Sequence, residues 1–250
     1  MNRHTLIQML KEEIAQGRVV TIVGTGVSVM ACGNQEVEGC KVATWIGLLE
    51  HGVKHCKDIG KADEDDVKLL TDQIQSRKTN FLISAAEEIS SRLKEHAPGE
   101  LRRWLTETVG TLKIKDPAIL DVLAALPGVL ATLNYDSLIE TATKRRAITW
   151  KEANKTQEVL QGKITDAVLH LHGWFDEPES VVLGMRSYLT VKDDPHAKAV
   201  LDSLTIEHTL LFVGCGDTVL DPNFTRLIEW GKEALKDSPH VTICSAARRR

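Results

Sequence analysis

Paired cysteines are missing from this 250-residue chain. Its five cysteines are scattered, and no two of them have the two-residue gap typical of zinc knuckles and dithiol redox motifs. The cysteine count is odd, so a complete disulfide framework is not indicated either. We therefore expect free thiols in a reducing compartment and no bound metal.

An excess of basic charge is also missing, as is any long apolar run. The chain has 31 Lys and Arg against 35 Asp and Glu, which gives a formal net charge of −4. The basic clusters 144–146 and 248–250 are interpreted as solvated charge. No apolar run reaches the ~18 residues that cross a bilayer, and no apolar signal core follows Met1. We expect a soluble, cytoplasmic protein with no evident nucleic-acid or membrane binding.

Short β-branched runs alternate with helical periodicity along much of the chain. Residues 19–23 form an apolar run that ends in glycine, after a helical pattern over 5–16. Further strands are predicted at 129–133, 167–171, 209–213 and 240–244, and 181–183 is either an edge strand or a loop. Further helices are predicted at 136–147, 195–207 and 223–236, and residues 27–43 are predicted to be a loop.

A long helical block separates the first strand from the second. Its periodicity runs from Thr44 to His96, and further helices are predicted at 99–110 and 116–126. This block is too long for a simple crossover, so we predict a helical insert or subdomain over 44–127 within a single domain over 1–250. Alternating strands and helices predict an α/β fold, a Rossmann-like doubly wound parallel sheet.

Ligands of such sheets bind beyond the carboxyl ends of the strands. Four clusters follow predicted strands and are expected to line one crevice, namely Gly24-Thr25-Gly26-Val27-Ser28, Asn134-Tyr135-Asp136, His172-Gly173 and Gly214-Cys215-Gly216-Asp217. Three of the four contain glycine, and their polar groups are suited to a sugar and a phosphate. We therefore place the site at this edge of the sheet.

The turn Gly24-Thr25-Gly26 allows the backbone to approach a pyrophosphate closely. Val29 stands where the third glycine of a dinucleotide fingerprint would fall. The turn is thus either a phosphate-binding loop or a structural link. Gly214 and Gly216 have the same two interpretations, and Asp217 either bonds a ribose or caps a helix.

Three polar residues after the middle strands are candidates for chemistry. Asn134 can bond a ribose hydroxyl and hold a water, whereas Asp136 either receives a ligand donor or caps the next helix. His172 is either a general base or a histidine satisfied by the backbone. We favour it over His170 because it lies at the strand end. Trp45, like Trp174, lines a pocket or packs in the core.

In their order along the chain, the motifs Gly-Thr-Gly-Val-Ser, Thr-Leu-Asn-Tyr-Asp, Leu-His-Gly and Phe-Val-Gly-x-Gly-Asp resemble the sirtuin superfamily. They look most like the sirtuin-like NAD-hydrolase domains of bacterial anti-phage defence systems, over residues 19–236. The resemblance implies that NAD is the substrate and that Asn134 and His172 are the catalytic pair, with Asp136 on the nicotinamide side. It also implies NAD binding by Gly24, Thr25, Gly26, Ser28, Gly214, Gly216 and Asp217.

The chain departs from protein-deacetylating sirtuins in two ways. It has no Cys-x-x-Cys pairs for a structural zinc, and residues 29–43 lack the Ile-Pro-Asp-Phe-Arg type of segment. Both departures favour water over an acyl-lysine as the acceptor. We therefore expect an NAD⁺ hydrolase that releases nicotinamide and ADP-ribose and depletes NAD in anti-phage defence.

Two other functions remain open from the sequence. The chain is alternatively a sensor that binds NAD or ADP-ribose without turnover, or a zinc-free NAD-dependent deacylase. The resemblance further implies a homo-oligomer, and a separate sensor or partner protein.

Overall fold

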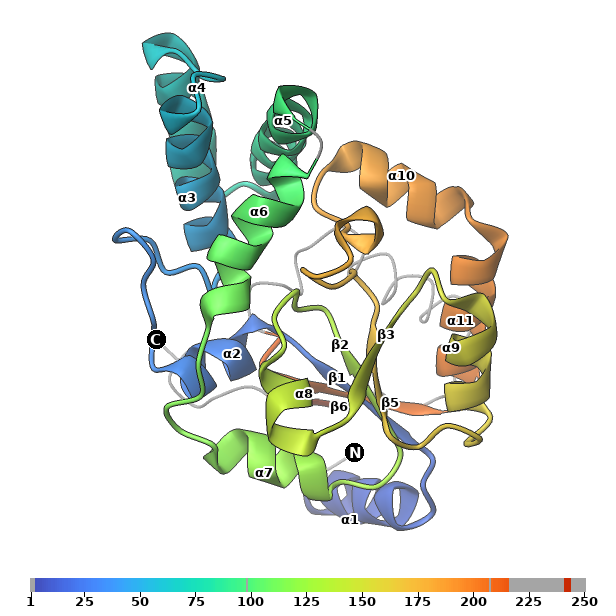
Figure 1. Cartoon of the computed structure of the whole chain (residues 1–250). Coiled ribbons are helices and arrows are strands. Elements are labelled where there is room, and N and C mark those ends of the chain that lie inside the picture. Colours follow the sequence, from blue (N-terminus) through green and yellow to red (C-terminus); the bar gives the residue numbers. More distant parts are fainter. Residues whose placement is uncertain (1–2, 98, 207, 216–240, 244–250) are drawn as a thin grey trace.

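A six-stranded parallel sheet forms the centre of the molecule, with strand order β3-β4-β2-β1-β5-β6 (Figure 1). The computed structural model describes residues 3–97, 99–206, 208–215 and 241–243. Its strands are β1 (Val19–Val23), β2 (Val129–Thr132), β3 (Arg146–Thr149), β4 (Ala167–His170), β5 (Thr209–Val213) and β6 (Val241–Ile243). The sequence-based prediction of an α/β fold with a Rossmann-like doubly wound parallel sheet is confirmed.

Helices precede and connect the strands. They are α1 (Arg3–Ala15), α2 (Thr25–Cys32), α3 (Trp45–Asp58), α4 (Glu64–Gln75), α5 (Thr79–His96), α6 (Glu100–Glu107), α7 (Ala118–Ala125), α8 (Leu138–Thr143), α9 (Ala153–Leu160), α10 (Met185–Asp193) and α11 (Pro195–Ile206), with short 3₁₀ turns η1 (Val109–Thr111) and η2 (Pro178–Ser180). The helix predicted at 223–236 lies outside the described residues.

The two faces of the sheet bury alternate residues of each strand, as the two-residue period of a strand requires. Val20 and Ile22 of β1 pack on one face with Val159 of α9 and Val200 and Leu204 of α11. On the other face, β1 packs against α1, α2 and their neighbours through its alternate residues. Helices therefore cover both sides of the sheet, and its strands are buried.

The order in which the chain adds strands to the sheet reverses between β1 and β5, while the strands themselves stay parallel. From β1 it continues to β2 on one side, and from β5 it continues to β6 on the other. The crevice beyond the carboxyl ends of two such strands is the usual ligand site of a doubly wound sheet. Gly24 follows β1 and Gly214 follows β5, so both glycines lie at this crevice.

The predicted loop over 27–43 is wrong for its first residues, because α2 extends to Cys32. Gly24 precedes the helix in an extended conformation, and Gly33 ends it in the left-handed region at φ 62°, where its amide donates to the Val29 carbonyl. The helix is short and rich in small residues, so its period is weak in the sequence. Its burial against the sheet stabilises it instead.

The predicted helix over 136–147 is also too long. Lys144 adopts φ 58° and ends α8, and the chain then enters β3, which the sequence analysis missed. β3 has only four residues, and its pairing with β4 is a long-range contact that periodicity does not report. Residues 181–183 form no strand and are buried in a loop. The helices α9 and α10 were not predicted.

Between α2 and β2 the chain is helical, as expected for 44–127. α3, α4 and α5 pack on one another and project from the sheet (Figure 1), whereas α7 packs against α2 and α8. The boundaries of this block as an insert stay a prediction. In the described part of the chain, the helices are too short or too polar to cross a membrane.

Candidate functional site

The glycine turn after β1 lies against the end of β5. The Gly24 amide donates to the Val213 carbonyl at 2.9 Å, and the Gly26 amide donates to the Gly214 carbonyl at 2.8 Å. A Cβ on Gly26 would lie 2.7 Å from the Gly214 oxygen, and one on Gly24 would lie 2.8 Å from the Cys215 Cα. Both glycines are therefore required by packing between two strand ends, and their contact with phosphate stays a prediction.

Three side chains from α2 and the loop after β2 form a buried hydrogen-bonded chain. The Asn134 side-chain amide, Nδ2, donates to Ser28 Oγ at 2.8 Å, and Ser28 Oγ donates to Asp136 Oδ2 at 2.6 Å. All three residues are at most 6% exposed. The loop after β2 is thus fastened to the helix that begins at the glycine turn.

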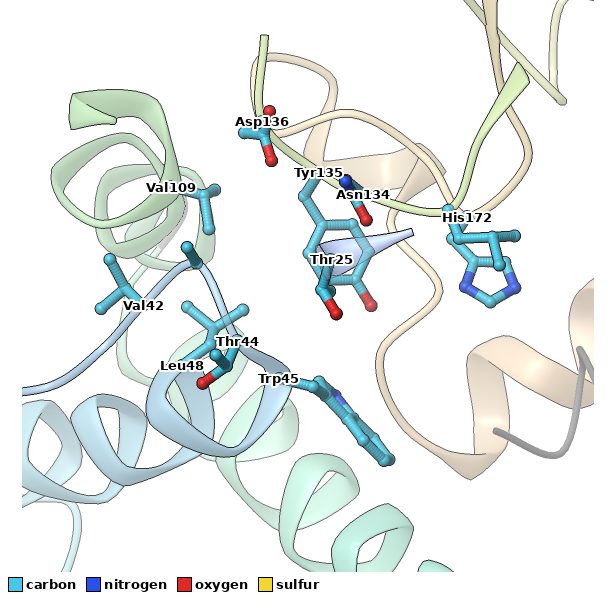
Figure 2. Close-up of a pocket in the computed structure, with 12 residues that line it drawn as sticks. Thr25, Val42, Thr44, Trp45, Leu48, Val109, Asn134, Tyr135, Asp136 and His172 are labelled. Carbon is cyan, nitrogen blue, oxygen red and sulfur yellow. The ribbon is translucent and has the colours of Figure 1, made fainter. Parts of the chain in front are cut away.

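This chain of bonds fixes the orientation of the Asn134 amide. Because the Ser28 hydroxyl donates its only hydrogen to Asp136, its oxygen must accept from the Asn134 nitrogen. The other amide atom, Asn134 Oδ1, is buried and has no hydrogen-bond partner among the described residues. An unpaired buried carbonyl is costly, and in Figure 2 this residue faces the pocket. Asn134 therefore offers an acceptor to a water or a ligand hydroxyl.

Asp136 is held from two sides. Its Oδ1 accepts from the Leu138 amide at 3.0 Å, which braces the turn before α8, while Oδ2 accepts from Ser28. Burial raises the pKa of the Asp136 carboxyl above its ordinary value, and the two hydrogen bonds partly offset that shift. The N-cap position of α8 is Ser137, so Asp136 braces the turn just before the helix, and its contact with nicotinamide stays a prediction.

His172 lines the same pocket as Asn134, from the loop after β4. Its ring stands edge-on to Tyr188 with 6.3 Å between ring centroids, and its carbonyl accepts from the Val182 amide at 2.9 Å. β4 ends at His170, so the strand's regular alternation does not extend to His172. His170 is fully buried and pairs with Glu140 instead of lining the pocket.

The opposite wall of the pocket comes from the helical block. Figure 2 shows Thr25, Asn134 and Tyr135 at its centre, with His172 on one side and Val42 and Val109 on the other. The full set of lining residues is Thr25, Val42, Ala43, Thr44, Trp45, Leu48, Val109, Leu133, Asn134, Tyr135, Asp136 and His172. The site is therefore polar at the strand ends and mainly apolar on the side of η1 and the start of α3.

Sequence reasoning missed most of that apolar wall. Trp45 and Trp174 are the two tryptophans that the sequence offers for a pocket or for the core; Trp45 lines this pocket, whereas Trp174 is not among its lining residues. One sequence signal was available, because Thr44 is the N-cap of α3 and accepts from the Gly47 amide at 3.0 Å. Val42 and Val109 carry no chemical motif and are revealed only by the fold.

The predicted site residues divide into three groups. Thr25, Asn134, Asp136 and His172 line one pocket. Gly24, Gly26, Ser28 and Gly214 lie behind or beside it through the contacts given above. Gly216 and Asp217 lie outside the described residues. Within the described ranges, no three His, Cys, Asp or Glu side chains are grouped to hold a metal.

Comparison with known proteins connects this pocket to a family. Residues 128–250 match the SIR2-like domain family. Over this second half of its length, the chain is similar to SIR2-like domains. The resemblance to the sirtuin superfamily inferred from the motifs is thereby confirmed, and the matched segment contains Asn134, Asp136, His172 and Gly214.

One curated protein with a similar sequence is Defense-associated sirtuin 2 from Bacillus subtilis. The two sequences are 30% identical over 123 residues, which is 48% of this chain and 12% of that protein. The chain thus spans only part of the length of this relative. The turn at Gly24 precedes the matched residues, but β1 pairs with both β2 and β5, so the turn follows a strand of the same sheet as the matched segment.

Proposed function

We propose that this SIR2-like chain hydrolyses the bond between nicotinamide and ribose in NAD⁺. The observation that carries the proposal is the Asn134 amide, whose nitrogen is held by Ser28 and whose buried Oδ1 has no partner in the described structure. Its carbonyl lies in the same pocket as His172. An acceptor and a base in one pocket suit the positioning and activation of water.

Asn134 and His172 have different roles in the proposed reaction. The bond between C1′ of the ribose and the nicotinamide nitrogen breaks, and its electron pair leaves with neutral nicotinamide. The oxygen of water bonds to C1′, and the proton that it loses passes to His172 and then to solvent. Asn134 orients the water or the ribose, as an oxocarbenium-like transition state requires.

The remaining residues support this division of roles. Asp136 supplies buried negative charge behind Asn134, or holds the carboxamide. The turn at Gly24, Thr25 and Gly26, with Gly214, Gly216 and Asp217 on the β5 side, binds the rest of NAD. The switch-point position of this turn supports the assignment, because dinucleotides bind there in doubly wound sheets.

The biological setting is part of the proposal. The name of the relative, Defense-associated sirtuin 2, links that protein to defence, and we propose that this chain depletes cytoplasmic NAD in anti-phage defence. We further propose that the chain acts as a homo-oligomer and responds to a separate sensor or partner protein. Metal is not required by this chemistry.

The product identifies the reaction. The chain is incubated with NAD⁺ in H₂¹⁸O, with and without an acetyl-lysine peptide, and products are separated by mass spectrometry. Hydrolysis predicts nicotinamide and ADP-ribose with one ¹⁸O, whether or not the peptide is present. O-acetyl-ADP-ribose formed only with the peptide would identify a deacylase instead.

A binding measurement completes the test. Calorimetric titration with NAD⁺ is run on the same preparation. Binding with no product, alone or with extract from phage-infected cells, would overturn hydrolysis in favour of an NAD sensor. No binding and no product would overturn both functions.

A further inference from the structure

His170 connects the two loops that carry the proposed catalytic residues. It is fully buried at the end of β4, and its Nδ1 lies 3.2 Å from the carbonyl oxygen of Asn134 and 3.2 Å from that of Gly173. Asn134 is itself the proposed water-binding residue, and Gly173 directly follows His172. One ring nitrogen therefore contacts the backbone of both loops.

The partners of the ring determine where its protons lie. Both neighbours of Nδ1 are carbonyl oxygens, which only accept, so Nδ1 must carry a hydrogen. On the other side of the ring, Nε2 lies 2.7 Å from Glu140 Oε1. A carboxylate at that position favours a hydrogen on Nε2 as well. His170 is thus set to donate in two directions.

Charge around the ring agrees with this geometry. Burial lowers the pKa of His170, but attraction to Glu140 and the hydrogen bonds to Glu140 and Gly173 outweigh it, so the net pKa is raised. Asp136 adds a further favourable interaction with the charged ring. The groups that face the ring, from α8 and from the loop after β2, therefore favour the imidazolium.

Local backbone geometry makes the Gly173 carbonyl a fixed target. Gly173 has φ +87°, and a Cβ there would collide with the Ser180 carbonyl oxygen, so the residue and its conformation are constrained. The two loops also meet directly, where the Phe175 amide donates to the Tyr135 carbonyl at 3.0 Å. His170 lies inside this junction, which explains how a buried polar ring is accommodated.

We propose that His170, held by Glu140, is a positioning residue that sets the spacing between Asn134 and His172 through the two carbonyls at its Nδ1. Its catalytic consequence rests on the proposed NAD⁺ hydrolysis, whereas its effect on the loops does not. Because reacting groups must be placed within a fraction of an ångström, a small loop displacement lowers the rate strongly.

Two substitutions separate the two ring nitrogens. Asparagine places an amide nitrogen near the position of Nδ1, and glutamine places one near the position of Nε2. His170→Asn therefore keeps a donor to the carbonyls, whereas His170→Gln keeps only the link to Glu140. His55→Gln is the matched control, since His55 pairs with Glu100 at 2.8 Å, is mostly buried, and does not line the pocket.

The mobility of the loops after β2 and β4 is measured first, by hydrogen exchange of the full chain at peptides covering 133–138 and 171–176. We expect His170→Gln to accelerate exchange in both peptides at least ten-fold, and His170→Asn and His55→Gln to leave them near wild type. Melting temperatures confirm that each variant is folded. Equal exchange in the two His170 variants, or no change in either, would overturn the proposal.

Activity is then compared on the same variants with NAD⁺. We expect His170→Gln to lower kcat about ten-fold or more with little change in KM, and His170→Asn to retain most of it. A wild-type chain that neither binds nor cleaves NAD⁺ would overturn the proposed function alone, since the exchange contrast still decides the role of His170. Equal kcat in both variants with NAD⁺ turnover intact would overturn the positioning role.

Discussion

The side-chain nitrogen of Asn134 donates to Ser28 Oγ across 2.8 Å, between segments that are 106 residues apart in the sequence. The contact joins the glycine turn after β1 to the loop after β2. It also decides which end of the Asn134 amide faces the pocket. The orientation of the proposed water-binding group therefore depends on a serine that need not touch the substrate.

Ser28→Ala tests that dependence. The substitution removes the acceptor of the Asn134 nitrogen, so the amide is free to rotate and the site is less well ordered. We expect kcat for NAD⁺ cleavage to fall about ten-fold, equivalent to about 1.4 kcal/mol, with a smaller change in KM. Steady-state nicotinamide release measures both constants.

Ser90→Ala is the matched control for this change. Ser90 is a buried serine on α5 that does not line the pocket. It should leave both constants unchanged. Equal rates for Ser28→Ala and the wild type would show that the amide does not need this anchor.

Gly26→Ala tests the contact between the two strand ends. A new Cβ would meet the Gly214 oxygen at 2.7 Å and its Cα at 3.0 Å, and both are backbone atoms that cannot move without displacing β5. We expect a lower melting temperature and loss of NAD⁺ binding by calorimetry.

Gly162→Ala separates a general loss of stability from a loss of NAD⁺ binding. Gly162 has φ +70° with open space around it, so alanine there strains the backbone by about 1 kcal/mol without blocking a neighbour. It should lower the melting temperature while NAD⁺ binding is retained. Wild-type affinity in Gly26→Ala would refute the role of this turn.

The Asp136 carboxyl should give stability a specific pH dependence. Its folded-state pKa is raised by burial, so its contribution is fully present below the ordinary pKa near 3.8 and is lost as the pH rises through the folded value. Relative to Asp136→Asn, the wild type should therefore lose stability as the pH rises through this window. Urea unfolding at a series of pH values measures the difference.

Asp121→Asn is the control for that series, because Asp121 is exposed on α7. It reports the effect on stability of the same substitution at an exposed carboxyl. A wild type that gains stability relative to Asp136→Asn as the pH rises would contradict the raised pKa of Asp136.

Trp45→Ala tests the apolar wall. Trp45 lines the pocket opposite the strand ends, so its loss should weaken binding of substrate and transition state together. We expect KM for NAD⁺ to rise about five- to ten-fold with kcat within two-fold, while Trp45→Phe stays closer to wild type. A fall in kcat with unchanged KM would place Trp45 among the residues that act on the reaction itself.

The strand-end residues were predictable because a parallel sheet brings the ends of its strands to one edge. That rule placed Thr25, Asn134 and His172 together from sequence alone, and the structure agrees. The rule says nothing about side-chain partners. The positions of Ser28 behind Asn134 and of His170 behind both loops follow from long-range packing that no local pattern records.

Other features were hidden for related reasons. α2 is short and made of small residues, and β3 is held as a strand by its pairing with β4. Neither segment therefore has a strong hydrophobic periodicity of its own. The apolar wall comes from residues such as Val42 and Val109, which look like ordinary core positions in the sequence. Only the path of the helical block across the sheet edge makes them pocket residues.

The most direct test of the proposed function is NAD⁺ consumption by Asn134→Ala beside the wild type, both checked for folding by melting temperature. The account predicts that the wild type releases nicotinamide and ADP-ribose and that the variant, though folded, shows at least a hundred-fold lower rate. His172→Ala should behave in the same way. Wild-type turnover in folded Asn134→Ala would contradict the account.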